Sequence, residues 1–216
     1  MPSALSRANR LLDAPLQVGP RILMLLAAVL LCAIYTFPLW NLTMFAPQYQ
    51  DGLRMDIYSY KLVGGNHGQD IKEINVLNHY IGMKDLVAED FTEFKWMPFV
   101  VGAIALLVLR AVVHGKFANL VDVLVLSFYF AAFSMWSFAY KLWWYGHNLL
   151  PSAAVKIDPF MPPLFGYKQL ANFEVYSYPG MASYALGAAM LLLLVSAVLA
   201  WRQTRGDIGV PAPAAA

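Results

Sequence analysis

Four long apolar runs stand out along the chain, separated by more polar stretches. The runs cover residues 21–40, 97–113, 120–144 and 180–201. Each is close to the roughly 20 residues that a helix needs to cross a bilayer core of about 30 Å. The pattern therefore predicts a mainly α fold, with a four-helix transmembrane bundle. These spans delimit five further segments, at 1–20, 41–96, 114–119, 145–179 and 202–216.

Basic residues near the span ends predict the orientation of the bundle, because cytoplasmic segments are rich in Lys and Arg. They lie in the terminal segments, at span ends and in the short link: Arg7, Arg10, Arg21, Arg110, Lys116, Arg202 and Arg205. The 41–96 loop instead carries eight acidic residues against five Lys or Arg. We therefore expect a multi-pass protein of the cytoplasmic membrane with both termini in the cytoplasm. The 41–96 and 145–179 loops are expected outside.

The first apolar run lies near the N-terminus, where such a stretch can be a cleaved signal peptide instead of a membrane span. It lacks a small-residue cleavage site and is longer than the usual signal-peptide core. We therefore expect it to remain as an anchor. Aromatic residues at the outer span ends are typical of the headgroup layer: Trp40, Trp96, Trp143 and Trp144.

The two outer loops carry periodic patterns of their own. Leu53, Met55 and Ile57 alternate with polar residues, which predicts a half-buried strand. Asp70 and Glu73 predict a capping box at the start of a helix over residues 71–82. In the second loop, the sequence FEVYSY predicts a short strand. Neither loop has enough apolar surface to fold alone, so both are expected to form one small mixed α/β cap.

Composition narrows the class of protein. The chain is 60% hydrophobic and 13% charged, with a mean hydropathy of +0.55, which is too apolar for an ordinary soluble domain. The net charge is only +2 and no basic run suggests nucleic acid. The single cysteine, Cys32, cannot form a disulfide or a cysteine metal site within one chain. No histidine lies in a span, which argues against a haem held within the bundle, and no nucleophile–base pattern indicates an enzyme.

His79 and Met83 are the candidate metal ligands. Imidazole and thioether without thiolate suit Cu(I) in an oxidising compartment. Asn75, His79 and Met83 follow one another at intervals of four residues, so a continuous helix would place them on one face. His147 and Met161 are the candidate further ligands, and Asn75 could orient the imidazole.

A structural role is the alternative for the same residues. Methionine often fills gaps in a core, which would place Met83 among apolar side chains. Asn78 and His79 could equally form a buried polar pair that fixes the fold of the cap. The residue types alone leave both interpretations open.

Three segments resemble a group of bacterial multi-span membrane proteins with an outer LNHYIGM segment. The segments are APQYQDGLRMDIY, INVLNHYIGMKDL and DPFMPPLFGYKQLANFEVYSYPG, and the resemblance covers roughly residues 44–86 and 158–180. That group is associated with gene clusters for periplasmic copper enzymes of the nitrous oxide reductase type. The resemblance implies a bacterial inner-membrane protein with a copper-linked accessory role.

Two functions follow as hypotheses. The first is an integral membrane accessory protein that handles Cu(I) on the outer side and supports a periplasmic copper enzyme. The alternative is a non-catalytic anchor or subunit that docks a periplasmic or membrane protein partner through its cap. A solute transporter is disfavoured, because the spans lack polar residues near the membrane midplane.

Overall fold

The computed structural model describes residues 4–170 and 172–209. Residues 1–3 of the expected 1–20 segment and 210–216 of the expected tail lie outside the described residues. The chain divides into two compact units. Unit 1 combines the residues up to Cys32, Val101–Phe130 and the residues from Ala185 onward, and unit 2 combines Ala33–Val100 with Ala131–Tyr184.

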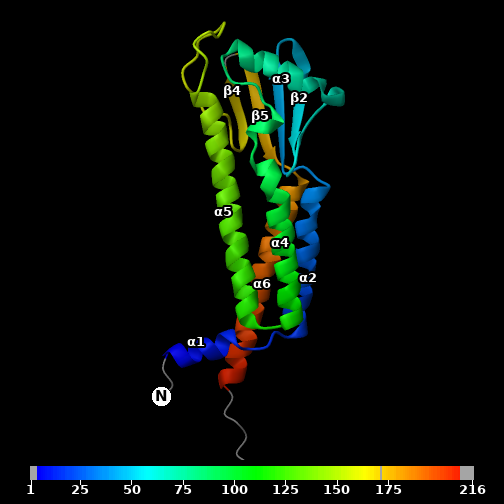
Figure 1. Ribbon diagram of the computed structural model, residues 1–216, viewed down its shortest axis with the longest axis vertical. Helices are drawn as coiled ribbons and strands as arrows, with labels where there is room; N and C mark the ends of the chain where they lie inside the picture. Colours follow the sequence, from blue (N-terminus) through cyan, green and yellow to red (C-terminus); the bar gives the residue numbers. More distant parts are fainter. Residues whose placement is uncertain (1–3, 171, 210–216) are drawn as a thin grey trace, which may run out of the picture. The chain divides into compact units, whose positions relative to one another are not determined.

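Unit 1 consists mainly of long helices that run side by side (Figure 1). These helices are α2 (Val18–Leu31), α4 (Glu93–His114), α5 (Phe117–His147) and α6 (Met181–Gly209), each of which also leads into or out of unit 2. Four helical segments are long and apolar enough to cross a membrane: Val18–Tyr35, Glu93–His114, Phe117–His147 and Met181–Thr204. The apolar runs in the sequence are thus confirmed as helices of spanning length.

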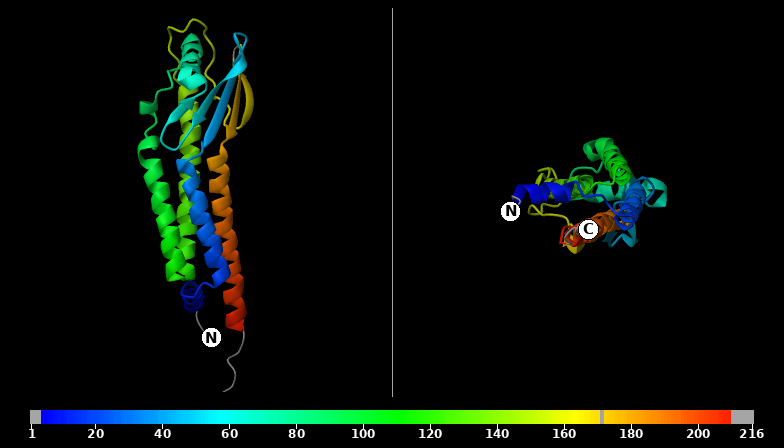
Figure 2. Two further views of the ribbon diagram at one scale, coloured as in Figure 1. Left: turned by 90° about the vertical axis from the view of Figure 1, so that its right-hand side faces the viewer. Right: turned by 90° about the horizontal axis from the view of Figure 1, so that it is seen from below.

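A short amphipathic helix, α1 (Ala4–Leu12), lies at one end of unit 1 and runs roughly perpendicular to the long helices (Figure 2). The segment that follows α1 pairs with the link between α4 and α5. The Leu16 N–H donates to the Gly115 carbonyl at 2.6 Å, and the Phe117 N–H donates to the Ala14 carbonyl at 3.0 Å. These bonds hold α1 at the same end of unit 1 as the α4–α5 link.

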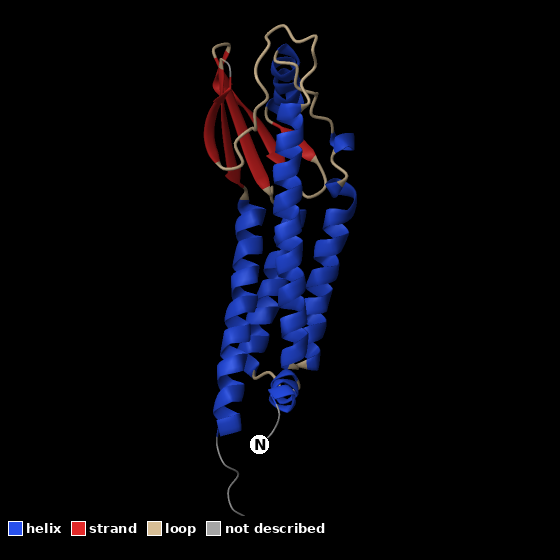
Figure 3. Ribbon diagram, turned by 90° about the vertical axis from the view of Figure 1, so that its left-hand side faces the viewer, coloured by secondary structure: helices blue, strands red, loops and turns tan. Residues whose placement is uncertain are grey.

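Unit 2 contains a five-stranded antiparallel sheet with the order β3-β2-β1-β5-β4 (Figure 3). The strands are β1 (Trp40–Ala46), β2 (Tyr49–Ile57), β3 (Leu62–Gly64), β4 (Gly166–Leu170) and β5 (Phe173–Pro179). The first three strands come from one expected loop and the last two from the other. The central strand β1 pairs with β5, placing Leu42 opposite Ser177. The two loops therefore fold together, as the sequence predicts.

One face of this sheet forms the core of unit 2. Along β1 the side chains of Trp40, Leu42 and Met44 are buried, while those between them are only partly buried. Helix α3 (Gln69–Tyr80) contributes Ile74 and Leu77 to the same apolar cluster. Burial of this face is the main stabilising contribution that the sheet makes, because each fully buried aliphatic side chain contributes roughly 1.5–3 kcal/mol.

The predicted capping box is wrong. Helix α3 begins at Gln69 after Gly68, and no side chain caps its first turn. The buried Asp70 carboxylate instead accepts from the Arg54 backbone N–H and from the Asn66 side-chain amide, each at 2.8 Å. The other acidic residue of the expected box, Glu73, accepts a hydrogen bond from the Tyr49 hydroxyl. Both carboxylates therefore bind α3 to neighbouring segments rather than to its own N-terminus.

The expected first span is too long at its outer end. Helix α2 continues as a 3-10 turn over Cys32–Tyr35 and stops there. Pro38 lacks an N–H and disfavours a helical conformation in the residue before it, so the chain leaves the helix ahead of it. Trp40 then begins strand β1, where its side chain is only 5% exposed. The interpretation of Trp40 as a headgroup anchor is therefore wrong, because this side chain belongs to the core of unit 2.

Candidate docking surface in unit 2

Exposed aromatic side chains form a continuous row along one face of α5. We call Phe133, Trp136, Tyr140, Trp143 and His147 the aromatic ladder. Their intervals of three and four residues place them on one helical face. The first four are between 43% and 61% exposed. Exposed aromatic area of this extent on one element is typical of an interaction site.

The rings of the ladder contact one another in sequence. Centroid distances are 5.8 Å for Phe133–Trp136 and Trp136–Tyr140, 6.0 Å for Tyr140–Trp143 and 4.4 Å for Trp143–His147. Aromatic pairs of this kind contribute roughly 0.5–1.5 kcal/mol each. Their mutual contacts therefore restrict the side chains and make the ladder a preformed surface.

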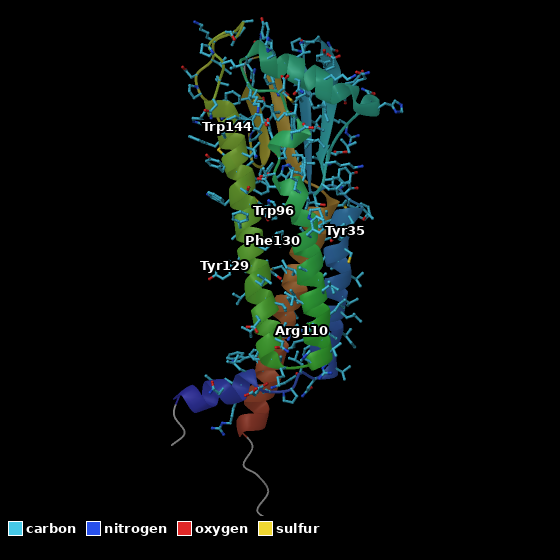
Figure 4. All side chains as sticks on the ribbon, in the orientation of Figure 1. Tyr35, Trp96, Arg110, Tyr129, Phe130 and Trp144 are labelled. Carbon is cyan, nitrogen blue, oxygen red and sulfur yellow. The ribbon has the colours of Figure 1, made fainter. Side chains whose placement is uncertain are left out.

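A sixth ring joins the ladder from α4. Trp96 lies on the side of α4 that faces α5 (Figure 4) and approaches Phe133 with a centroid distance of 5.8 Å. At the other end, the His147 Nδ1 atom lies 2.9 Å from the Trp143 carbonyl oxygen, which fixes the imidazole over the indole. The ladder therefore has a defined orientation at both ends.

The opposite face of α5 is anchored in the core of unit 2. Phe138 packs against Trp40 with a centroid distance of 4.9 Å. Tyr145 is buried, and Trp144 packs against the same apolar cluster. Because this face is held by the sheet, α5 cannot rotate freely and must present the ladder away from the core.

A polar cluster fixes α5 against the start of α4. The Ser137 hydroxyl donates to Glu93 at 2.6 Å, and the Lys141 ammonium lies 3.7 Å from the same carboxylate. Lys141 also donates to the Asp90 carbonyl oxygen at 2.6 Å, while the Tyr145 hydroxyl donates to the Asp90 carboxylate at 3.1 Å. These bonds define the level along α5 at which α4 begins, namely at Ser137.

Hydrogen bonds to two carboxylates of unit 2 shift the pKa values of Asp90 and Tyr49. The Lys84 ammonium lies 2.6 Å from Asp90 and donates to it, which lowers the pKa of that carboxyl. The pKa of Tyr49 is raised, mainly because its hydroxyl donates to Glu73. Both pairs connect segments of unit 2 that are distant in sequence.

The two principal candidate metal ligands lie in different surroundings. His79 is exposed on α3, whereas Met83 is only 9% exposed and belongs to the apolar core. The helix ends at Tyr80, and Gly82 has a φ of 79°, so the helical count from His79 does not extend to Met83. The Met83 N–H donates to the Asn78 carbonyl at 2.8 Å, and the Gly82 N–H donates to the His79 carbonyl at 3.1 Å. This is a Schellman ending, in which the residue after the glycine turns back onto the helix.

The remaining members of the candidate set make other contacts. The Asn75 amide exchanges two hydrogen bonds with the Leu86 backbone, at 2.8 and 3.3 Å, and so holds the following loop. His147 is stacked on Trp143 at the end of α5. Met161 lies in the loop before β4, where its carbonyl accepts from Lys168 at 2.9 Å. The expectation of one shared helical face for Asn75, His79 and Met83 is therefore corrected by the structure.

The buried polar pair considered as the alternative is also not formed. Asn78 is completely buried, and both polar atoms of its side chain lack a hydrogen-bond partner. His79, its expected partner, is exposed. Within residues 4–170 and 172–209, no group of three or more His, Cys, Asp or Glu side chains is arranged to hold a metal ion.

Comparisons of the chain with protein families, curated proteins and solved structures found no match. The functional argument therefore rests on the residues themselves. The ladder is a feature of α5 that sequence reasoning does not single out, because it treats Trp143 and Trp144 only as expected headgroup anchors. Its signal was present in the sequence, as aromatic residues at 133, 136, 140 and 143 with the interval of a helical face.

Proposed function

We propose that this protein is a non-catalytic subunit of a membrane complex, which docks a second membrane-bound protein along the aromatic ladder. The observation that carries the proposal is the exposure of a preformed aromatic row on a helix whose other face is buried. Trp and Tyr are the residue types that most often dominate binding energy at protein interfaces. The ladder offers both, at its centre and at its outer end.

The proposal includes a membrane placement. The four apolar helices would cross the cytoplasmic membrane, with α1 and the α4–α5 link on the cytoplasmic side and the sheet outside. The basic residues beside that link and the acidic balance of the 41–96 loop support this orientation. Burial of only 22–33% of each candidate span within the chain supports contact of these helices with lipid or with another protein.

Lipid alone would not cover the whole ladder in this placement. The charged Glu93 begins α4 and contacts Ser137, so the membrane surface would lie near that level of α5. His147 is ten residues further along the helix, about 15 Å at 1.5 Å per residue. Tyr140 would then lie within the headgroup layer, which Trp and Tyr favour, whereas Trp143 and His147 would reach its outer edge and extend beyond it. A protein partner would cover this outer end of the ladder, which lipid alone does not.

The chemistry of the ladder defines the kind of partner. Phe133, Trp136, Tyr140 and Trp143 are aromatic residues without a formal charge, so the contacting surface should be uncharged and apolar. An interval of three and four residues matches a partner helix that packs ridges into grooves at a shallow angle. We therefore infer a partner with a membrane-spanning helix that continues for two or three turns above the membrane.

Docking is favoured over Cu(I) handling by the positions of the candidate ligands. A site formed by His79 and Met83 would require Met83 to leave the apolar core and its Schellman turn to open. The ladder requires no rearrangement to accept a partner. A copper-linked role through an associated copper enzyme remains compatible with docking, since the partner could itself be the copper protein.

The experiment is site-specific photo-crosslinking in native membranes. A photoreactive phenylalanine analogue is placed at Tyr140 or Trp143, and at Tyr184 as the matched control. Tyr184 is an exposed tyrosine on α6, outside the ladder. We expect a discrete protein adduct from the two ladder positions and none from position 184.

The second arm tests dependence on the ladder. Trp136→Ala and Trp143→Ala should each weaken recovery of the crosslinked partner by tenfold or more, because truncation of an interface tryptophan often costs about 2 kcal/mol or more. Tyr184→Ala should leave recovery unchanged. Adducts with lipid alone would overturn the proposal, and an adduct with a second copy of the chain would replace the heterologous partner by a homo-oligomer.

A further inference from the structure

The turn between β2 and β3, at residues 58–61, lies at the end of the sheet that is joined to the candidate spans. Trp40 at the start of β1 pairs with Ile57 at the end of β2, and β1 follows the candidate span Val18–Tyr35. The end of β5 also pairs with the start of β1, and it precedes the candidate span Met181–Thr204. The turn therefore lies where the chain passes between the sheet and the spans.

Hydrogen bonds hold this turn against the end of the first of these spans. Ser59 is completely buried, and its hydroxyl donates to the Ile34 carbonyl at 3.0 Å. The Tyr60 hydroxyl donates to the Tyr35 carbonyl at 3.5 Å. The level of the turn is thus fixed at the last two residues of the candidate span.

The two ends of the sheet carry different kinds of exposed residue. At the span end, Tyr35, Phe37 and Tyr60 are between 40% and 48% exposed. At the other end, the turn between β1 and β2 consists of Pro47 and Gln48, both exposed. Tyrosine is enriched at membrane–water interfaces, because its ring suits an apolar layer and its hydroxyl a polar one. The contrast indicates that the span end of the sheet meets a lipid surface and that the other end meets water.

Lys61 brings a positive charge to the aromatic end of the sheet. Its ammonium nitrogen lies 5.3 Å from the ring centroid of Tyr58 and 5.3 Å from that of Tyr60, and the two centroids are 6.0 Å apart. Contacts of this kind attract the ammonium to the rings and restrict its position. Among the described residues 4–170 and 172–209, no carboxylate pairs with this ammonium. Its N–H donors are therefore open to an anion from outside the chain.

We infer that this turn is a lipid anchor, in which Lys61 binds the phosphate of a phospholipid in the outer leaflet. The inference rests on the membrane placement proposed above, which puts the end of the span Val18–Tyr35 at the outer headgroups. Lysine side chains near span ends extend toward the headgroups, so the ammonium donates to the phosphate oxygens. The exposed ring of Tyr60 contacts the top of the acyl chains below it. The phosphate is common to all phospholipids, so the anchor recognises phosphate and not a particular headgroup.

The test is fluorescence quenching in liposomes that contain the full-length protein. Cys32 is replaced by alanine, and a dye is attached to Phe37→Cys near the turn or to Gln48→Cys at the other end of the sheet. Strand β1 (Trp40–Ala46) has seven residues and separates these ends by about 20 Å. Lipids with a nitroxide near the top of one acyl chain should quench the dye at position 37 and leave the dye at position 48 bright.

Two quenchers with the same nitroxide chain measure recognition of the phosphate by the dye at position 37. One is a phosphatidylcholine and the other a diacylglycerol, which has no phosphate. The phospholipid is expected to bind about tenfold more tightly beside the turn, the effect of one hydrogen bond to a charged group. Lys61→Gln should abolish this preference. Lys72→Gln is the matched control, because Lys72 is an exposed lysine on α3, and it should leave the preference unchanged.

Several outcomes would overturn the inference. These are an absence of quenching at position 37, equal quenching at positions 37 and 48, equal binding of the two lipids by the wild type, and an unchanged preference in Lys61→Gln. Inorganic phosphate in the buffer should leave the preference intact, because it lacks the acyl chains that hold a lipid beside the turn. Loss of the preference in inorganic phosphate would assign Lys61 to a soluble anion and overturn the lipid assignment.

Failure of the anchor is recognised separately from failure of the proposed function. Carbonate extraction of the same liposomes reports whether the helices are inserted in the bilayer. Photo-crosslinking at Tyr140 in native membranes reports whether the aromatic ladder docks a partner. A protein that is inserted and docked but shows no phosphate preference at position 37 would exclude the anchor alone.

Discussion

Met83 shows how one left-handed residue redirects the side chain that follows it. Gly82 has a φ of 79°, which ends the helical rise and turns the chain back over the last turn of α3. The Met83 backbone then bonds to Asn78, and its side chain enters the core. A side chain placed there contributes packing to the apolar cluster, whereas His79 is exposed.

Substitutions at these two positions should therefore differ in their effect on stability. Met83→Ala should lower the free energy of unfolding by about 2–5 kcal/mol through the cavity that it leaves. Met83→Leu conserves volume and should cost less than about 1.5 kcal/mol. His79→Ala, at an exposed position, should stay within about 0.5 kcal/mol of the wild type. Chemical denaturation in detergent measures all three.

The same variants test the Cu(I) hypothesis. If docking is the function, His79→Ala and Met83→Leu should match the wild type in a competition titration with a Cu(I) chelator. A shared copper site would instead weaken Cu(I) binding in both variants by an order of magnitude or more. Met83→Leu is the informative member, because it removes the sulfur while preserving the fold.

Asn78 is the least favourable buried residue of α3. Its amide is fully buried and makes no hydrogen bond through either polar atom. Replacing a buried unpaired polar group by an apolar one of similar size removes a desolvation penalty of about 1–3 kcal/mol. Asn78→Leu should therefore raise the thermal midpoint measured in detergent, and a lowered midpoint would show that the amide binds a partner such as an internal water.

At the scale of elements, α3 is bounded by two glycines with left-handed backbones. Gly68 has a φ of 90° and open space where a Cβ would lie. Gly82 has a φ of 79°, and a Cβ there would come within 2.8 Å of the Leu150 carbonyl oxygen and the Ala153 side chain. The backbone strain is thus similar at both ends, and only the C-terminal glycine is also enclosed by the second loop.

This difference gives a matched pair of variants. Gly68→Ala should destabilise by about 1–2 kcal/mol, the cost of a left-handed conformation for a residue with a Cβ. Gly82→Ala should cost clearly more, because the second loop must also move. Denaturation midpoints compare the two variants. An equal loss of stability would show that the loop containing Leu150 and Ala153 moves away from α3 at little cost in free energy.

The loop between α3 and α4 depends on an ion pair that titrates. Lys84 donates to Asp90 and lowers the pKa of its carboxyl, so the folded protein binds this proton less readily than the unfolded chain. The resulting stability is present above the unfolded pKa of about 4 and is lost as the pH falls through the lower folded pKa. Asp90→Asn should reduce this loss of stability at acid pH, which thermal unfolding measured between about pH 2 and 5 would reveal.

The elements that the sequence predicts best are those with a strong local period. The four long helices follow from their apolar runs, and the second strand follows from the alternation of Leu53, Met55 and Ile57. Strand β1 escaped prediction because its Trp40 directly continues an apolar span. Strand β4 escaped because three of its five residues are exposed at a sheet edge, which leaves no alternation to detect.

Side-chain partners are harder to predict than elements, because they depend on segments distant in sequence. Asp70 has the spacing of a cap, yet it bonds to Arg54 on the neighbouring strand. Met83 has the spacing of a helical face, yet the intervening glycine removes it from that face. The aromatic ladder needed only helical spacing, but its exposure depends on which face of α5 the sheet covers.

At the scale of the whole molecule, the proposed placement of four candidate spans would put both termini on one side of the membrane. The structure of unit 1 agrees with this, since α1 and the end of α6 line one cavity. The basic residues Arg21, Lys116 and Arg202 lie near span ends at which the chain would enter the cytoplasm. Lys61 and Asp158 belong to unit 2 and should lie outside.

Cysteine accessibility in intact cells checks this topology. Cys32 is first replaced by Ala to remove the natural thiol, and single cysteines are then placed at Lys61, Asp158 or Lys116. A membrane-impermeant maleimide should label positions 61 and 158 from outside and reach position 116 only after the cells are opened, because the bilayer excludes a charged reagent from the cytoplasm. Labelling of position 116 in intact cells would reverse the orientation and place the ladder on the cytoplasmic side. Labelling of 61 without 158 would mean that the two loops lie on opposite sides, which pairing of β1 with β5 forbids.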